Sequence, residues 1–241
     1  MSEFSTESAK QSGVFEDLLE VFWSPAAVFD RTRNANAWKY LLIIALLCCV
    51  VTVATASLVQ PYLEANADLQ IALQTKSGRA MPEQAVAMTR SITKYAYLVG
   101  PLFIIPIGAL LGALFVMWGG KTMSAPLRYG QALTILAISS APRLLGFIAT
   151  SAQGAILDSA NAHSMADLAL GPARFIDPYT VSPVVQGFLM TLDVFAIWQY
   201  VLIAIAVSVV ARVERSTGAI VSLISWALGA ALTLIPGLLA S

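Results

Sequence analysis

The chain has 241 residues, of which 58% are hydrophobic and only 12% are charged, and its mean hydropathy is +0.75. Soluble domains carry about 25% charged residues, so this composition excludes an ordinary soluble protein and is typical of a chain that crosses a membrane several times. The 14 basic and 14 acidic residues cancel, which leaves the chain as a whole without an electrostatic basis for binding nucleic acid.

The first residues, MSEFSTESAKQSG, are polar. A secretory signal begins with a basic region and an early apolar core, whereas the first long apolar stretch here begins near Tyr40. We therefore expect residues 1–13 to form a disordered tail that is retained in the cytoplasm.

Residues 14–37 show apolar side chains at helical spacing, separated by acidic ones. Ser24 and Pro25 are typical of a helix cap followed by a first helical residue. This pattern predicts one or two short amphipathic helices that lie in the inner membrane interface. The alternative is a helix packed on the rest of the protein. The side chains expected to enter the interface are Phe15, Leu18, Leu19, Phe22 and Phe29.

Residues 38–241 are predicted to form an all-α domain of five transmembrane helices, since a helical span needs about 20 apolar residues. We expect the loop over residues 60–94 to extend the first two spans outward as a helical hairpin. The five apolar stretches are residues 38–59, 95–120, 132–157, a fourth from 184 or 192 to 211, and 219–240.

The basic residues of the short loops predict the orientation, because cytoplasmic loops are enriched in Lys and Arg. The loops KTMSAPLR and ARVERSTG are both basic. We therefore expect a multi-pass protein of the inner (plasma) membrane, with a cytoplasmic N-terminus and a periplasmic or extracellular C-terminus.

Two charged residues fall inside apolar stretches. Arg143 lies eleven residues after Ala132, which is about 17 Å along a helix and close to the middle of a bilayer. An arginine there costs about 2.5–3.5 kcal/mol on insertion scales and should face protein or water. The helix break expected at Pro142 frees a backbone carbonyl nearby. Asp193 is the predicted counter-charge, paired directly or through water, either as a structural clamp or as part of an ion or substrate path.

Small residues recur on two predicted helices. Gly108 and Gly112 form a G-x-x-x-G pattern, and such faces let helix backbones approach closely. We expect these faces to serve internal packing, with contact to another protomer or protein as the alternative. The second face consists of Ser225, Gly229, Thr233 and Gly237.

Catalytic and metal-binding patterns are not found in the sequence. It has one histidine and no G-x-S-x-G or H-E-x-x-H motif, so it offers little for acid–base or nucleophilic chemistry. The adjacent Cys48 and Cys49 suggest neither a disulfide framework nor a metal site. We expect no enzyme activity, no cofactor and no metal.

The order of these features resembles the Yip (Ypt-interacting protein) domain family in its bacterial form, over about residues 15–240. The most specific parts are SPAAVF at 24–29, the stretch from Gly130 to Pro142, and Asp193 to Trp198. Eukaryotic members are linked to small GTPases, but their Asp-Leu-Tyr-Gly-Pro motif before the first span is absent, so that role is not carried over. Some bacterial members resemble accessory subunits encoded beside ATP-binding-cassette exporters.

The resemblance implies a non-enzymatic membrane protein that organises the membrane or serves as an accessory subunit of another membrane complex. The alternative is a small transporter or channel with a path near Arg143 and Asp193. A water-filled cavity that reaches Arg143 would favour the alternative, and a dry, packed arginine would favour the first function. The expected partners are the lipid bilayer and, beyond it, other integral membrane proteins or further copies of the chain.

Overall fold

The computed structural model describes residues 13–75 and 81–239, with side-chain surroundings in the last helix described as far as Leu234. The predicted tail over residues 1–13 lies outside this part except for Gly13. The helices in chain order are α1 Val14–Glu20, α2 Pro25–Thr32, α3 Ala37–Ala54, α4 Ala56–Thr75, α5 Glu83–Val99, α6 Pro101–Thr122, α7 Tyr129–Ser139, α8 Ala141–Ile156, the short 3-10 turns η1 Ser159–Asn161, η2 Met165–Leu168 and η3 Pro172–Phe175, then α9 Pro183–Met190, α10 Val194–Ala211 and α11 Arg215–Leu239.

Five stretches of helix in the described chain are long and apolar enough to cross a membrane, which confirms the predicted all-α fold with five spans. The fourth span begins at Val194 rather than Val184, because α9 is a separate short helix. The five spans are Ala37–Ala54 (α3), Pro101–Thr122 (α6), Tyr129–Ile156 (α7 with α8), Val194–Ala211 (α10) and Arg215–Leu234 (within α11).

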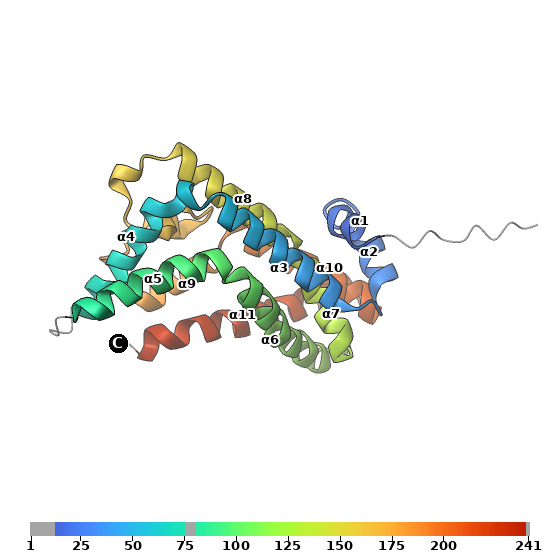
Figure 1. Cartoon of the computed structure of the whole chain (residues 1–241). Coiled ribbons are helices and arrows are strands. Elements are labelled where there is room, and N and C mark those ends of the chain that lie inside the picture. Colours follow the sequence, from blue (N-terminus) through green and yellow to red (C-terminus); the bar gives the residue numbers. More distant parts are fainter. Residues whose placement is uncertain (1–12, 76–80, 240–241) are drawn as a thin grey trace, which may run out of the picture.

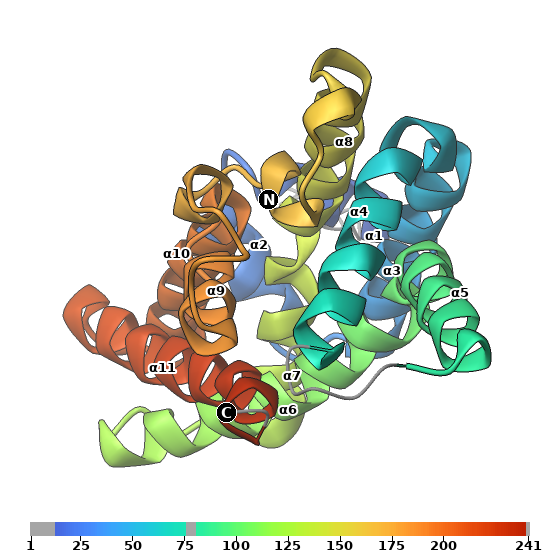
Figure 2. The same ribbon diagram turned by 90° about the vertical axis from the view of Figure 1, so that its left-hand side faces the viewer.

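The spans run side by side, and the additional helices gather at their two ends (Figure 1). We call the end that carries α1 and α2 the N-terminal end, and the opposite end, where α4, α5, α9 and the C-terminus lie, the C-terminal end. Figure 2 looks along the bundle from the C-terminal end and shows α9, α10 and α11 on one side and α3, α4 and α5 on the other.

The central helix of the bundle is α7, because α3, α6 and α10 all pack against it. Residues 132–140 are buried without exception, as expected for a helix that is apolar on every side. Ile135 and Ile138 of α7 share one core with Leu41 and Ile44 of α3 and with Ile203 of α10.

The third span is broken between α7 and α8. α7 ends at Ser139, α8 begins at Ala141, and Pro142 is therefore the second residue of α8. A proline is tolerated in the first turn of a helix, where its missing N–H has no intrahelical partner. The break places Arg143 in the first turn of α8.

Two helices extend the first two spans beyond the bundle, as the amphipathic loop pattern predicts. α4 follows α3 after Thr55, α5 runs into α6 through Gly100, and α4 and α5 pack against each other. An exposed ion pair, with Arg90 Nη2 2.6 Å from Asp68 Oδ1, joins them. This hairpin covers part of the C-terminal end.

Candidate functional site

A cavity of about 390 Å³ lies between α8, α10 and the loop that contains η2, in the half of the bundle nearer the C-terminal end; we call it the Arg143 cavity. Its volume is in the range of sites that hold small molecules, about 300–1,000 Å³. The large apolar side chains of its lining are Phe147, Met165, Leu168, Leu170, Met190 and Phe195.

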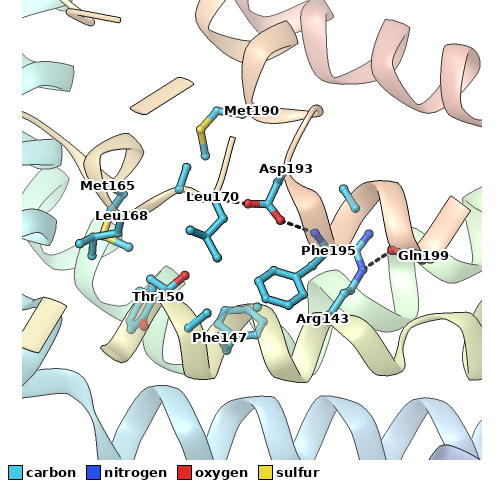
Figure 3. Close-up of a pocket in the computed structure, with 15 residues that line it drawn as sticks. Arg143, Phe147, Thr150, Met165, Leu168, Leu170, Met190, Asp193, Phe195 and Gln199 are labelled. Carbon is cyan, nitrogen blue, oxygen red and sulfur yellow. Dashed lines mark hydrogen bonds between the residues drawn. The ribbon is translucent and has the colours of Figure 1, made fainter. Parts of the chain in front are cut away.

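Arg143 is exposed to this cavity. Its Nε donates a hydrogen bond of 2.8 Å to Oε1 of Gln199 on α10 (Figure 3). Gln199 is buried, with 4% of its surface exposed. An arginine carries five N–H donors, and within the described part of the chain no second acceptor hydrogen-bonds this guanidinium. Gln199 therefore orients the arginine and leaves its two terminal nitrogens for a ligand or water.

Asp193 also lines the Arg143 cavity, but both of its carboxylate oxygens accept hydrogen bonds from backbone N–H groups. As the N-cap of α10, it accepts a 2.9 Å bond from the Phe195 backbone N–H through Oδ1, and a 3.1 Å bond from the Leu170 backbone N–H through Oδ2. The first N–H groups of a helix lack intrahelical acceptors, which explains why this carboxylate faces the helix end. Arg143 and Asp193 share one cavity without a direct ion pair among the described residues, and a pair bridged by water or ligand stays a prediction.

Tyr97 of α5 also lines the cavity. Burial raises the pKa of its phenol above the ordinary value of 10.0. The hydroxyl is therefore neutral under physiological conditions, and Arg143 is the positively charged group of the lining.

The protein is packed between Arg143 and the N-terminal end of the bundle. Ile138 and Ile203 are fully buried there, and Ser139 and Ser140 are buried beside the helix break. The Ser140 hydroxyl, at the C-cap of α7, donates a 2.7 Å bond to the Leu136 carbonyl of that helix. The Arg143 cavity thus ends at the arginine instead of crossing the bundle.

Comparison with known families decides the relationship that the sequence suggests. The model of the Yip1 domain matches residues 19–235. The chain belongs to the Yip1 domain family. The matched region agrees with the resemblance expected over about residues 15–240 and contains all five spans of the Yip1 domain. Neither a curated protein nor a solved structure matches the chain.

The N-terminal helices of the Yip1 domain divide their apolar side chains between protein and surroundings. Leu18 and Phe29 lie in the main core, 7% and 1% exposed. The Phe22 ring packs edge-on against Trp198 of α10, with ring centroids 5.2 Å apart. Phe15 and Leu19, in contrast, are each 60% exposed. Of the five residues predicted to enter the interface, two are therefore buried in the protein, Phe22 is partly buried, and two are exposed.

A buried polar cluster fastens these helices to the first span, and sequence reasoning did not find it. Asp17 of α1 is 2% exposed. Its Oδ1 accepts bonds of 2.8 and 2.6 Å from Nε and Nη2 of Arg31 on α2, and its Oδ2 accepts a 2.6 Å bond from the Tyr40 hydroxyl on α3. Nη2 of Arg31 also lies 2.6 Å from Glu20, and the hydrogen bond to Glu20 is the largest contribution to a raised pKa of the guanidinium. The signal in the sequence was Asp17, an acidic residue directly before the apolar Leu18, and the two are buried together.

The predicted small-residue faces are partly used inside the Yip1 domain. A Cβ atom added at Gly112 would lie 3.1 Å from Leu136 Cδ1, and one at Gly229 would lie 3.4 Å from the Tyr200 hydroxyl. Ser225 is buried. At Gly108 an added Cβ would meet nothing within 4 Å. Thr233 is exposed, and Gly237 lies beyond the residues whose surroundings are described.

A close backbone approach between α8 and α4 involves a glycine outside these patterns. A Cβ atom at Gly154 of α8 would lie 2.6 Å from the Leu58 carbonyl oxygen of α4. Isolated glycines give no periodic signal, so the sequence alone does not predict this contact.

As to metals, the described residues contain no group of three or more His, Cys, Asp or Glu side chains that could hold an ion.

Proposed function

We propose that this Yip-type membrane protein binds a small anionic ligand at Arg143 and acts, without catalysis, as an accessory subunit of another membrane complex. The observation that supports the proposal is a guanidinium that faces a cavity with its terminal nitrogens free of acceptors in the described chain. A charge near the middle of a span is costly and usually marks a functional position. An anion would supply the acceptors that neither lipid nor Gln199 supplies.

The packing between Arg143 and the N-terminal end supports binding over conduction. A path would have to pass Ile138 and Ile203, which are fully buried. The second candidate function is a small transporter in which this closed arrangement is one state. The cavity that reaches Arg143 favours that candidate, since transport sites lie near the middle of the bilayer at broken helices.

A paired experiment separates these two functions. The wild-type protein and the Arg143→Gln variant are extracted from native membranes in mild detergent, and proteins that co-purify are identified. The wild-type protein and the variant are also reconstituted into liposomes, and the entry of small carboxylates is followed with an internal pH dye. We expect a co-purifying membrane protein whose retention depends on Arg143, and entry equal to that of empty liposomes. Entry that requires Arg143 would replace the accessory function by transport.

We further propose that the N-terminal end faces the cytoplasm of a cell with this protein in its inner membrane, which places the Arg143 cavity toward the outside. Basic residues support this orientation: a second cavity, at the N-terminal end, includes Arg33 and Arg128 in its lining. Cytoplasmic loops are enriched in such residues. A reporter active only outside the cytoplasm should be active after Ser241 and silent when inserted between Lys121 and Arg128. Activity in the loop fusion would reverse the orientation.

A further inference from the structure

We propose that the ligand of the Arg143 cavity is an amphiphile with one carboxylate and one apolar chain, such as a medium-chain fatty acid. The inference rests on the proposed function, that an anion binds at Arg143, and adds the chemical class of that anion. It is drawn from how the polar and apolar groups are distributed along the cavity.

The positive charge of the lining and its amide partner lie at one end of the cavity. Figure 3 shows Arg143 and Gln199 together at this end, with the hydrogen bond between Nε and Oε1. The bond holds one edge of the guanidinium and leaves the terminal nitrogens as paired donors. Such a planar fork matches the two oxygens of a carboxylate, which it binds through parallel hydrogen bonds.

Apart from Asp193, Tyr97 and Thr150, the side chains that line the rest of the cavity are apolar. Phe147 and Phe195 lie next to the arginine, and Met165 and Leu168 line the far end (Figure 3). Met190 is 44% exposed, so this wall offers an apolar surface that the protein itself does not cover. Methionine side chains adapt to ligands of varied shape. An apolar chain attached to the anionic group would follow this wall and remove it from water.

The charge of the cavity favours a single negative charge on the ligand. Asp193 is part of the lining, and its carboxylate is fixed by backbone bonds to Leu170 and Phe195. A phosphate monoester carries about −1.5 to −2 charges at pH 7, so its second charge would face Asp193 without a cation to offset it. A carboxylate carries one charge, which Arg143 balances.

The test measures binding of tritiated decanoate to the full chain in lipid nanodiscs, with binding to empty nanodiscs subtracted. Unlabelled competitors separate the parts of the ligand: acetate has the head without the chain, decanol has the chain without the charge, and decyl phosphate has a doubly charged head. We expect unlabelled decanoate to compete at least tenfold better than each of the other three.

Two variants and one control connect binding to the structure. Arg143→Gln should weaken decanoate binding at least tenfold. Thr150→Phe should weaken it at least fivefold while keeping the arginine, because Thr150 lines the apolar end. The control is Arg174→Gln. Arg174 also bonds a glutamine, with Nη1 2.6 Å from Gln153 Oε1, but it is outside the cavity lining, so its loss should leave binding unchanged.

The outcomes distinguish the two levels of the proposal. Equal competition by acetate and decanoate, with binding still dependent on Arg143, would show that the ligand needs no apolar chain. The site would then bind small anions in general. Preferred binding of decyl phosphate would overturn the carboxylate in favour of a phosphate. If decanol competed as well as decanoate, and Arg143→Gln bound decanoate as well as the wild type, both this inference and the proposed function would be overturned.

Discussion

The Nε of Arg143 on α8 lies 2.8 Å from the Oε1 of Gln199 on α10, across a sequence separation of 56 residues. A neutral amide thus occupies the place where a carboxylate would cancel the charge of the arginine. The positive charge of the arginine therefore remains available to the cavity. Substitutions of Gln199 can either remove the acceptor of this hydrogen bond or give it a negative charge.

Gln199→Leu should destabilise the protein, and Gln199→Glu should not. The leucine removes a hydrogen bond to a charged group, which is worth about 1.5–3 kcal/mol. The glutamate keeps an acceptor and adds an opposite charge, so the melting temperature in detergent should equal or exceed that of the wild type. Both variants should lose anion binding, the second because its guanidinium is already paired. Equal destabilisation by both substitutions would show that the Nε bond does not hold Arg143.

The relation between Arg143 and Asp193 is tested by a double-mutant cycle. Without a direct ion pair, the losses from Arg143→Leu and Asp193→Leu should add within about 0.5 kcal/mol, as for residues that do not interact. Asp193→Leu also removes the cap of α10, at a cost of about 0.5–2 kcal/mol, whereas Asp193→Asn keeps a good cap. A double variant that recovers stability would instead show the water-bridged charge pair.

Much of the fold follows from the sequence because hydropathy adds up over a whole span. About 20 apolar residues in a row leave few alternatives to a transmembrane helix, and Pro142 marks the region where the third span breaks. The boundary between α9 and α10 is less visible, since both helices are apolar. It depends on Asp193, which acts as a cap of α10.

The candidate site is less predictable because its partners are far apart in the chain and one of them is neutral. Charge alone selects Asp193 as the partner of Arg143, but the backbone N–H groups of Leu170 and Phe195 occupy this carboxylate. The signal in the sequence for Gln199 was an amide inside the apolar stretch 194–211, but a neutral amide is not the partner that charge predicts for an arginine. The apolar face of α1 is similarly wide, and the pattern does not show that Leu18 faces the core while Leu19 faces outward.

The Asp17 cluster predicts a difference between two tyrosine substitutions. Tyr40→Phe removes a hydrogen bond to a buried carboxylate, which should cost about 1.5–3 kcal/mol. Tyr129→Phe is the matched control. It removes a 3.1 Å bond to the Leu110 carbonyl, and a neutral bond is worth about 0.5–1.5 kcal/mol. Unfolding of both variants in mixed detergent should show the larger loss for Tyr40→Phe. The reverse order would mean that the cluster does not fasten α1 and α2 to the bundle.

Two glycines should respond oppositely to alanine. Gly154→Ala places a Cβ 2.6 Å from the Leu58 carbonyl oxygen, and because that atom belongs to backbone, the helices must move apart at a cost of about 1–3 kcal/mol. Gly108→Ala meets open space and gains helix propensity worth up to about 1 kcal/mol. Thermal unfolding measures both effects. A lower oligomeric mass for Gly108→Ala would show that the G-x-x-x-G face binds a second copy.

The last prediction concerns the uncovered side of α1 and the turn that follows it. Phe15, Leu19 and Trp23 are 60%, 60% and 71% exposed. The spacing of four residues places Phe15 and Leu19 on one face of α1, and Trp23 lies in the turn that follows. Tryptophan is enriched where membrane meets water. We therefore expect these three side chains to enter the membrane interface, while Leu18 and Phe29 hold α1 and α2 on the protein.

Spin labels at Leu19 and at Glu16 test this arrangement in liposomes, since both residues are exposed on α1. The label at position 19 should relax with dissolved oxygen, which concentrates in lipid, and the label at 16 with a water-soluble nickel complex. Full burial of an apolar side chain is worth about 1.5–3 kcal/mol, and less at an interface. Replacing Phe15 and Trp23 by serine in the labelled proteins should therefore make position 16 and position 19 equally accessible to nickel. Equal accessibility already in the wild type would show that α1 rests on the bundle without touching lipid.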